Sequence, residues 1–180
     1  MPVVSVISLK GGVGKTSVVL GLAGAALERG LSTLVVDLDP QANASTGLGV
    51  DAGSLATSEV LADPRLAVFD SALLPSAWTT RNGSVGRVDV LAGSPRLEQL
   101  DEPKPTAASL RRLSTALGRL EEPYDIVLLD CPPTLRRLTR TGLDASDRVL
   151  VVAEPGLFSI DWDGIWDART RIDEKGWTAE

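Results

Sequence analysis

Apolar runs separated by amphipathic stretches dominate the pattern of this chain. Five runs rich in β-branched residues predict strands at residues 3–9, 33–38, 88–92, 125–130 and 148–153. Most of them are continuously apolar, as expected for strands that are buried on both faces. Such strands alternating with helices indicate an α/β fold. We therefore predict a three-layer sandwich, in which a mostly parallel sheet has helices on both faces.

Helical periodicity appears between these runs. Residues 16–29 predict a helix with an inner face of Val19, Leu22, Ala23, Ala26 and Leu27. Gly30 suits the C-terminal cap of this helix. We also predict helices at residues 58–62, 107–121, 135–145 and 161–175, and a polar surface loop at residues 75–86. The first strand, helix and strand form a βαβ unit with a right-handed crossover.

Composition narrows the class of protein. The chain has 180 residues, of which 43% are hydrophobic and 23% charged, so we expect residues 1–180 to form a single globular domain. It has no apolar run long enough for a transmembrane helix and no signal-peptide pattern, which favours a cytoplasmic protein. The absence of histidine and the lone Cys131 exclude histidine-based catalysis and internal disulfides. A net charge of −6 argues against a broadly basic surface, but not against a local basic patch.

A glycine-rich loop follows the first predicted strand and reads K-G-G-V-G-K-T. The common phosphate-loop pattern, G-x-x-x-x-G-K-[ST], requires a glycine at the position of Leu9, so this loop departs from it. The physical requirements still hold. Gly11, Gly12 and Gly14 allow the backbone to turn its N–H groups toward phosphate oxygens, and the following helix adds its partial positive charge. The alternative is a strand-to-helix turn without a ligand.

Two side chains of this loop carry the expected chemistry. The Lys15 ammonium would reach the β- and γ-phosphates of a nucleotide, and the Thr16 hydroxyl would bind Mg²⁺. Val13 and Ser17 complete the predicted nucleotide-binding segment, which also includes Lys10.

Carboxylates end two of the predicted strands. Asp37 and Asp39 lie in V-V-D-L-D-P-Q, where strand alternation places both on one side. Asp130 follows four apolar residues, which is the Walker B pattern of a magnesium-holding aspartate. Ligands bind at these strand ends in open α/β sheets. The alternative for Asp37 and Asp39 is that they only cap the next loop. Cys131 is predicted to be a packing residue, since nothing near it indicates an activated thiolate.

The loop K-G-G-V-G-K-T resembles the deviant Walker A motif of the ParA/MinD family of P-loop ATPases. D-L-D-P-Q and D-C-P-P resemble its switch I and switch II, and the likeness extends unevenly over residues 2–165. The resemblance implies that Lys10 is a signature lysine that reaches the nucleotide of a partner subunit. It further implies that Lys10, Lys15 and Asp39 are catalytic, with Asp39 orienting the attacking water, and that Asp37 supports Mg²⁺ beside Thr16 and Asp130.

The motif D-L-D-P-Q-A-N-A-S-T-G-L-G is similar to the chromosome- and plasmid-partition branch of this family. That branch implies an ATP- and Mg²⁺-dependent homodimer, a ParB-like stimulating protein, nonspecific DNA binding and a place at the nucleoid, with no membrane attachment. The final helices of the family usually lie beyond residue 180, so this domain is expected to lack the usual C-terminal part.

Arginines after switch II depart from the family pattern. Arg136, Arg137 and Arg140 are predicted to share one helix face, which is either solvated or a contact for nucleic acid or a partner. Trp162 and Trp166 are expected in the core or at an interface.

Three other functions are weighed against partitioning. A MinD-like membrane switch would need a basic amphipathic C-terminal helix, whereas this sequence ends R-I-D-E-K-G-W-T-A-E. An electron-transfer protein that resembles the nitrogenase iron protein would need two cysteines in each subunit for a shared cluster, whereas this chain has one. A non-enzymatic scaffold is disfavoured because the residues of the nucleotide site are intact.

Overall fold

A six-stranded sheet forms the centre of the computed structural model, which describes residues 1–51, 53, 55–82, 86–121 and 124–153. Its strand order is β3-β4-β2-β5-β1-β6. The strands are β1 (Val3–Ile7), β2 (Ser32–Asp37), β3 (Leu73–Pro75), β4 (Arg87–Leu91), β5 (Ile126–Asp130) and β6 (Arg148–Val151). Every pairing is parallel except that of β3 with β4. The predicted α/β class with a mostly parallel sheet is confirmed, and all five predicted strands are present.

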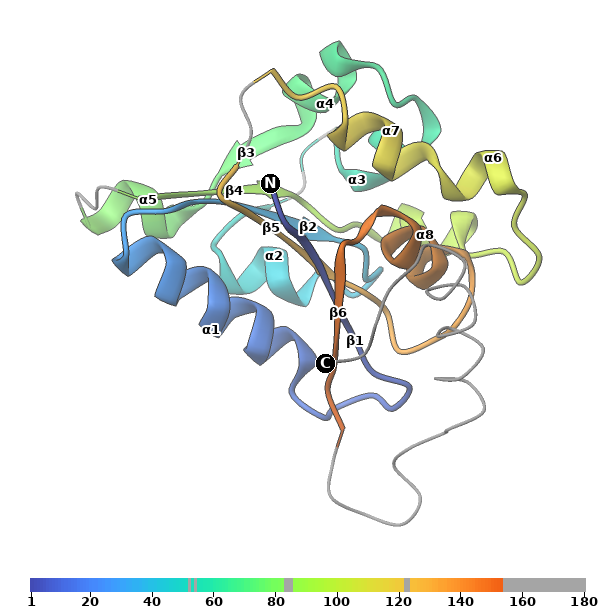
Figure 1. The fold of residues 1–180 in the computed structure, drawn as a ribbon, viewed down its shortest axis with the longest axis horizontal. Helices are drawn as coiled ribbons and strands as arrows, with labels where there is room; N and C mark the ends of the chain where they lie inside the picture. The colour runs from blue at the N-terminus through green and yellow to red at the C-terminus, as the bar shows by residue number, and fades with distance from the viewer. Residues whose placement is uncertain (52, 54, 83–85, 122–123, 154–180) are drawn as a thin grey trace.

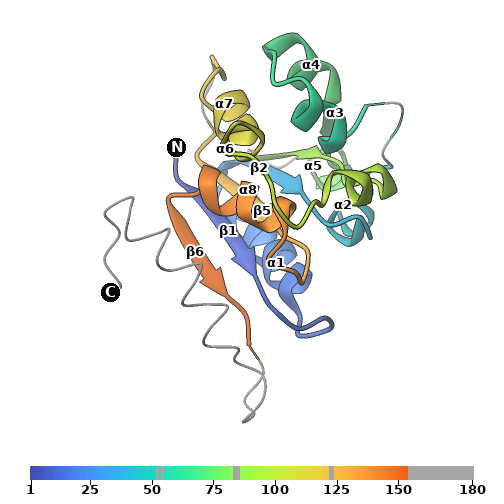
Figure 2. The same ribbon diagram turned by 90° about the vertical axis from the view of Figure 1, so that its right-hand side faces the viewer.

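Helices cover both faces of the sheet (Figure 1). The helical segments are α1 (Lys15–Glu28), α2 (Asn43–Gly47), α3 (Thr57–Ala62), α4 (Leu66–Ala72), α5 (Ala77–Asn82), η1 (Pro95–Leu100), α6 (Ala107–Leu110), α7 (Arg112–Leu117) and α8 (Arg137–Ala145). α1 and α2 lie on one face of the sheet, while α3, α4, α7 and α8 lie on the other. Turned by 90°, the molecule shows β6 beside β1 at the edge of the sheet, with α8 in front (Figure 2).

The two faces of the sheet belong to two hydrophobic clusters, and strand alternation divides the residues between them. In β2 and just after it, Leu34, Val36 and Leu38 pack with α3, α7 and α8, whereas Val35 packs with α1. All four side chains have no exposed surface. The sheet is therefore buried on both sides at its centre, which explains why β2 reads as a continuous apolar run.

The first helix begins and ends on glycine. Gly14 precedes α1 with a φ of 91°, and Gly30 follows the helix with a φ of 77°. The amides of Gly30 and Leu31 donate to the carbonyls of Leu27 and Ala26, each at 3.0 Å, which is the Schellman arrangement. The predicted role of Gly30 as a C-terminal cap is confirmed.

Three predictions of local structure are wrong. Leu22, predicted on the inner face of α1, is 39% exposed. Residues 75–86, predicted to be a loop, contain the end of β3 and the short helix α5. The helix follows Ser76, whose hydroxyl accepts from the Thr79 amide at 3.4 Å, a capping signal that polar composition concealed. The single helix predicted at residues 107–121 is two short helices that meet at Arg111 and end at Leu117. The Ser114 hydroxyl donates to the Arg111 carbonyl at this break. The helix predicted at residues 161–175, with both of its tryptophans, lies outside the described residues.

We expect an added methyl group to have opposite effects on the free energy of unfolding at two glycines in helices, Gly142 and Gly21. A Cβ at Gly142 would lie 2.8 Å from Cys131 Sγ and 3.2 Å from Ser5 Oγ, whereas a Cβ at Gly21 meets nothing within 4 Å. Gly142→Ala should lower the free energy of unfolding by about 1–2 kcal/mol, because overpacking outweighs the gain in helix propensity. The matched variant Gly21→Ala should raise it by about 0.5–1 kcal/mol. Urea titrations measure both, and a stabilised Gly142→Ala variant would contradict the tight packing of α8 against β1.

Candidate nucleotide-binding site

The glycine loop between β1 and α1 is open and preformed. Gly12 and Gly14 have φ values of 81° and 91°, in the left-handed region that favours glycine. Around Gly11, Gly12 and Gly14, a built Cβ would meet no atom within 4 Å, so the space above the backbone is free. The Ser8 hydroxyl donates to the Lys10 carbonyl at 2.5 Å and fixes the start of the loop.

A cleft of about 610 Å³ opens over this loop. It is lined by every residue from Lys10 to Ser17, together with Ser8, Asp39, Gln41, Asn43 and Pro133. The structure thus brings the whole predicted nucleotide-binding segment together with Asp39 in one concave surface. Sequence reasoning missed Ser8, and it included Pro133 only as part of the D-C-P-P motif. A hydroxyl at the end of the strand and the proline pair after Asp130 were the available signals.

Lys15, Thr16 and Asp130 form one polar cluster at the base of the cleft. Lys15 Nζ lies 2.5 Å from Asp130 Oδ1, and the Thr16 hydroxyl donates to Asp130 Oδ2 at 2.8 Å. Lys15 is 7% exposed and Asp130 is fully buried. Burial raises the pKa of Asp130, and the nearby Lys15 ammonium opposes that rise. The lysine therefore stabilises a carboxylate that would otherwise be costly to ionise.

Asp39 reaches the same cleft from the other side. Its Oδ2 lies 3.9 Å from Lys15 Nζ, and its Oδ1 accepts a hydrogen bond from the Gln41 amide at 2.9 Å. The chain then turns through Ala42, which has a φ of 53° and precedes α2. This left-handed alanine allows the chain to turn sharply after Asp39. The carboxylate is thus held beside the phosphate loop, with its second oxygen directed toward Lys15.

Asp37 makes its hydrogen bonds inside the protein. It is fully buried and does not line the cleft. Its Oδ2 accepts from the Ser45 amide and hydroxyl at 2.9 and 2.7 Å, and its Oδ1 accepts from the Asp39 amide at 3.1 Å. Protein donors thus occupy both oxygens of Asp37, as Lys15 and Thr16 do for Asp130, so the predicted support of Mg²⁺ by Asp37 stays a prediction. The bonds of Asp37 hold α2 and Asp39 in position.

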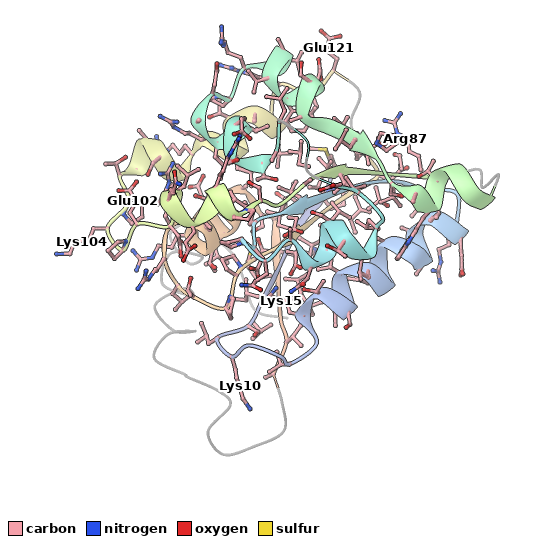
Figure 3. All side chains as sticks on the ribbon, turned by 180° about the vertical axis from the view of Figure 1, so that it is seen from behind. Lys10, Lys15, Arg87, Glu102, Lys104 and Glu121 are labelled. Carbon is pink, nitrogen blue, oxygen red and sulfur yellow. The ribbon has the colours of Figure 1, made fainter. Side chains whose placement is uncertain are left out.

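The predicted signature lysine, Lys10, lies at the outer end of the loop. Its side chain projects outward at the tip of the loop, whereas Lys15 points inward (Figure 3). Lys10 is exposed and also lines the cleft. An outward ammonium at this place is poorly directed at a phosphate held by its own loop.

The arginines after Asp130 do not share one exposed face, so that prediction is wrong. Arg137 is 6% exposed, and its Nη1 donates to Glu102 Oε1 at 2.8 Å. Arg136 is exposed, and Arg140 is half-buried. Only Arg136 and Arg140 therefore remain on the face that was expected to be either solvated or a contact, because the ion pair with Glu102 draws Arg137 into the protein.

Cys131 is a packing residue, as predicted. It has no exposed surface, and burial raises the pKa of its thiol to about 12. A thiol in this environment stays protonated and is a poor nucleophile at neutral pH.

The donor set fits a magnesium ion that is shared with a nucleotide. The Thr16 hydroxyl and the Asp130 carboxylate lie together beside the phosphate loop. Among the described residues, no group of three or more acidic, histidine or cysteine side chains forms a metal cage by itself. Mg²⁺ is commonly held by one or two protein oxygens together with phosphates and water, which matches this arrangement.

Among the residues that the structure describes, no helix is both long and apolar enough to cross a membrane.

The fold and this loop define a P-loop ATPase of the ParA/MinD type. Residues 1–174 match the AAA domain family AAA_31, so the chain belongs to that family. The sporulation initiation inhibitor protein Soj of Bacillus subtilis is 31% identical over 162 residues, which are 88% of this chain and 60% of Soj. The chromosome partitioning protein ParA of Caulobacter vibrioides is 33% identical over 162 residues, 88% of this chain and 58% of that protein. The chain thus spans about 60% of the length of these relatives.

A solved structure shows the same fold with ligands. Cobyrinic acid a,c-diamide synthase from Mycobacterium smegmatis, bound to an ATP analog and magnesium, superposes with a TM-score of 0.82 and 28% identity. The comparison covers 97% of this chain and 69% of the M. smegmatis chain.

The burial of Asp37 predicts a pH-dependent stability. Burial is the main reason that the pKa of Asp37 is raised from 3.8 to about 6, and the negative charge of Asp130 adds to the rise. A raised folded-state pKa means that the native protein loses stability as the pH rises through that value. Relative to Asp37→Asn, the parent should therefore lose about 2 kcal/mol of unfolding free energy between about pH 4.5 and about pH 7. Urea unfolding at both pH values measures this difference, and a pH-independent difference would contradict it.

Proposed function

We propose that this chain binds magnesium-ATP in the cleft and hydrolyses it, and that the bound nucleotide controls dimerisation. This proposal rests mainly on the contact of Lys15 and Thr16 with Asp130 at the base of an open glycine loop. A lysine, a hydroxyl and a buried carboxylate at this junction are the groups that phosphoryl transfer requires. Similarity to a protein that was solved with an ATP analog and magnesium supports this assignment.

Each group has a distinct proposed role. Loop amides from Gly11 to Thr16 bind the phosphate oxygens, and Lys15 leaves Asp130 to neutralise the β- and γ-phosphates. Thr16 and Asp130 hold Mg²⁺, which neutralises phosphate charge when it is bound. Asp39 accepts a hydrogen bond from the attacking water and aligns it with the γ-phosphate. Catalysis then comes mainly from positioning and charge neutralisation.

The biological role that we propose is partitioning of a chromosome or plasmid. Similarity to Soj and to the Caulobacter ParA, together with the segment 37–49, favours this branch. In the proposed cycle, the ATP-bound dimer binds DNA nonspecifically at the nucleoid. A ParB-like partner stimulates hydrolysis, which returns the protein to monomers. Arg136 and Arg140 are the candidate contacts for DNA or for this partner in the described region. A MinD-like positioning switch is the alternative function.

Nucleotide binding should depend on Lys15. We expect Lys15→Ala to weaken magnesium-ATP binding by about 100-fold, because the phosphates lose a charged hydrogen-bond donor. Calorimetry measures the affinity, and thermal unfolding checks that the variant stays folded after Asp130 loses its partner. Lys104→Ala is the matched control, since Lys104 is exposed and lies away from Lys15 and the cleft (Figure 3). Unchanged ATP affinity in a folded Lys15→Ala variant would refute the binding site.

Hydrolysis should depend on Asp39 without a matching loss of binding. Asp39→Ala should retain ATP affinity, because Lys15, Thr16 and Asp130 remain. Its hydrolysis rate should fall by about 10²–10⁴-fold, as expected when a water-positioning group is lost. Phosphate release under saturating ATP gives the rate, and an ATP-bound dimer should accumulate on size exclusion. If the rate falls only about twofold, another group positions the water.

Dimerisation should depend on Lys10. Its outward position predicts that Lys10→Ala changes the monomer's nucleotide affinity by less than about fivefold, the range of an exposed charge. The same variant should fail to form the ATP-dependent dimer. Light scattering with ATP and with ADP compares the parent, Lys10→Ala and Lys104→Ala. Normal dimerisation of Lys10→Ala would rule out the role across the interface.

A further inference from the structure

Residues 93–102, called here the connecting segment, join two parts of the candidate site that are far apart in sequence. The segment begins at Gly93, after β4, includes η1, and ends at Glu102. One of its ends contacts the residues around Asp39. The other contacts the residues that follow Asp130.

The first end is bonded to Ser45 in α2. The Gly93 amide donates to the Ser45 hydroxyl at 2.9 Å, and that hydroxyl donates to Asp37 Oδ2 at 2.7 Å. Gly93 is packed so closely that a Cβ there would lie 2.8 Å from the Asp39 carbonyl oxygen and 2.9 Å from Asp37 Cγ. Gly93 therefore packs directly against the Asp39 backbone, and Ser45 is linked to that backbone through Asp37, whose Oδ1 accepts from the Asp39 amide.

The second end supports the start of α8. Asp101 Oδ1 accepts from the Leu138 amide at 3.0 Å, and its Oδ2 accepts from the Thr134 hydroxyl at 3.3 Å. The Glu102 carbonyl accepts from the Arg137 amide at 3.1 Å, next to the Glu102–Arg137 ion pair. Asp101 thus acts as an N-terminal cap supplied from elsewhere in the chain. Thr134 adjoins Pro133, which lines the cleft.

The connecting segment is held firmly between its ends. Leu97 has no exposed surface and belongs to the larger core cluster. Ser94 Oγ lies 3.3 Å from Ser58 Oγ, and Arg96 pairs with Glu59 at 3.0 Å. Short helical structure packed in this way transmits a displacement at one end to the other.

We propose that the connecting segment is a positioning element for ATP hydrolysis, and that Asp101 and the Ser45 side chain bonded to Gly93 are positioning residues. It fixes the distance between the Asp39 turn and the chain after Asp130, so that the two sides of the cleft move together. This inference rests on the proposed ATPase function for its kinetic consequence. Its mechanical consequence can be measured without nucleotide.

The kinetic test separates kcat from binding. Ser45→Ala and Asp101→Ala should each lower kcat by about tenfold, since small misplacements of reacting groups are costly. Affinity for a non-hydrolysable ATP analog should change by less than about threefold, because the phosphate loop is untouched. The double variant should lose less than the product of the two single effects, as expected for residues that act through one element.

Two matched variants serve as controls. Asp101→Asn keeps an acceptor for the Leu138 amide and a polar partner for Thr134, so it should restore kcat close to the parent value. Glu98→Ala changes an exposed side chain on η1, in the same segment, and should leave kcat unchanged. Multiplicative losses in the double variant, or failure of Asp101→Asn to restore kcat, would overturn the proposal.

Hydrogen–deuterium exchange without nucleotide tests the element independently of hydrolysis. Ser45→Ala should speed exchange at residues 134–138, and Asp101→Ala should speed it at residues 39–47, each across the cleft from its own substitution. Exchange that increases only beside each substitution would overturn the inference, whether or not the parent hydrolyses ATP. If the parent binds no magnesium-ATP but exchange is coupled across the cleft, the proposed function fails and the mechanical inference stands.

Discussion

The buried charge of Asp130 is the constraint on which the candidate site depends. The residue ends the inner strand β5 and has no exposed surface, so its ionised form requires a partner within the protein. Lys15 supplies the opposite charge and Thr16 a hydroxyl, both from the first turn of α1. This ties the loop between β1 and α1 to the neighbouring strand. Asp130 thus fixes the C-terminal end of the glycine loop, and the Ser8 hydroxyl fixes its start through the Lys10 carbonyl.

Two buried carboxylates at adjacent strand ends have different surroundings. Asp37 and Asp130 are paired residues in the register of β2 and β5. Asp130 faces a lysine at the cleft, whereas Asp37 faces only hydroxyl and amide donors. The same residue type at paired strand positions therefore has two different sets of partners.

The sequence was sufficient for features that depend on local pattern. Continuous apolar runs located β2 and β5, and the glycine and lysine spacing located the phosphate loop, because short-range geometry sets both. The bond of Ser45, which holds Asp37, to the amide of Gly93 could not be predicted, because Gly93 lies 48 positions beyond Ser45. Arg137 was misplaced for a similar reason, since its partner Glu102 lies 35 positions earlier. Long-range hydrogen bonds decided these cases, and neither periodicity nor residue type reveals such bonds.

The packing of Cys131 gives the protein a built-in chemical reporter. It is the sole cysteine of the chain, and it is enclosed between β5 and α8, where Gly142 allows close approach. A thiol reagent can reach the sulfur only when α8 separates from the sheet, so the modification rate measures the frequency of that opening. Since Cys131 directly follows Asp130, the rate of its modification reports local opening of the structure at the base of the cleft. No engineered probe is needed to observe this opening.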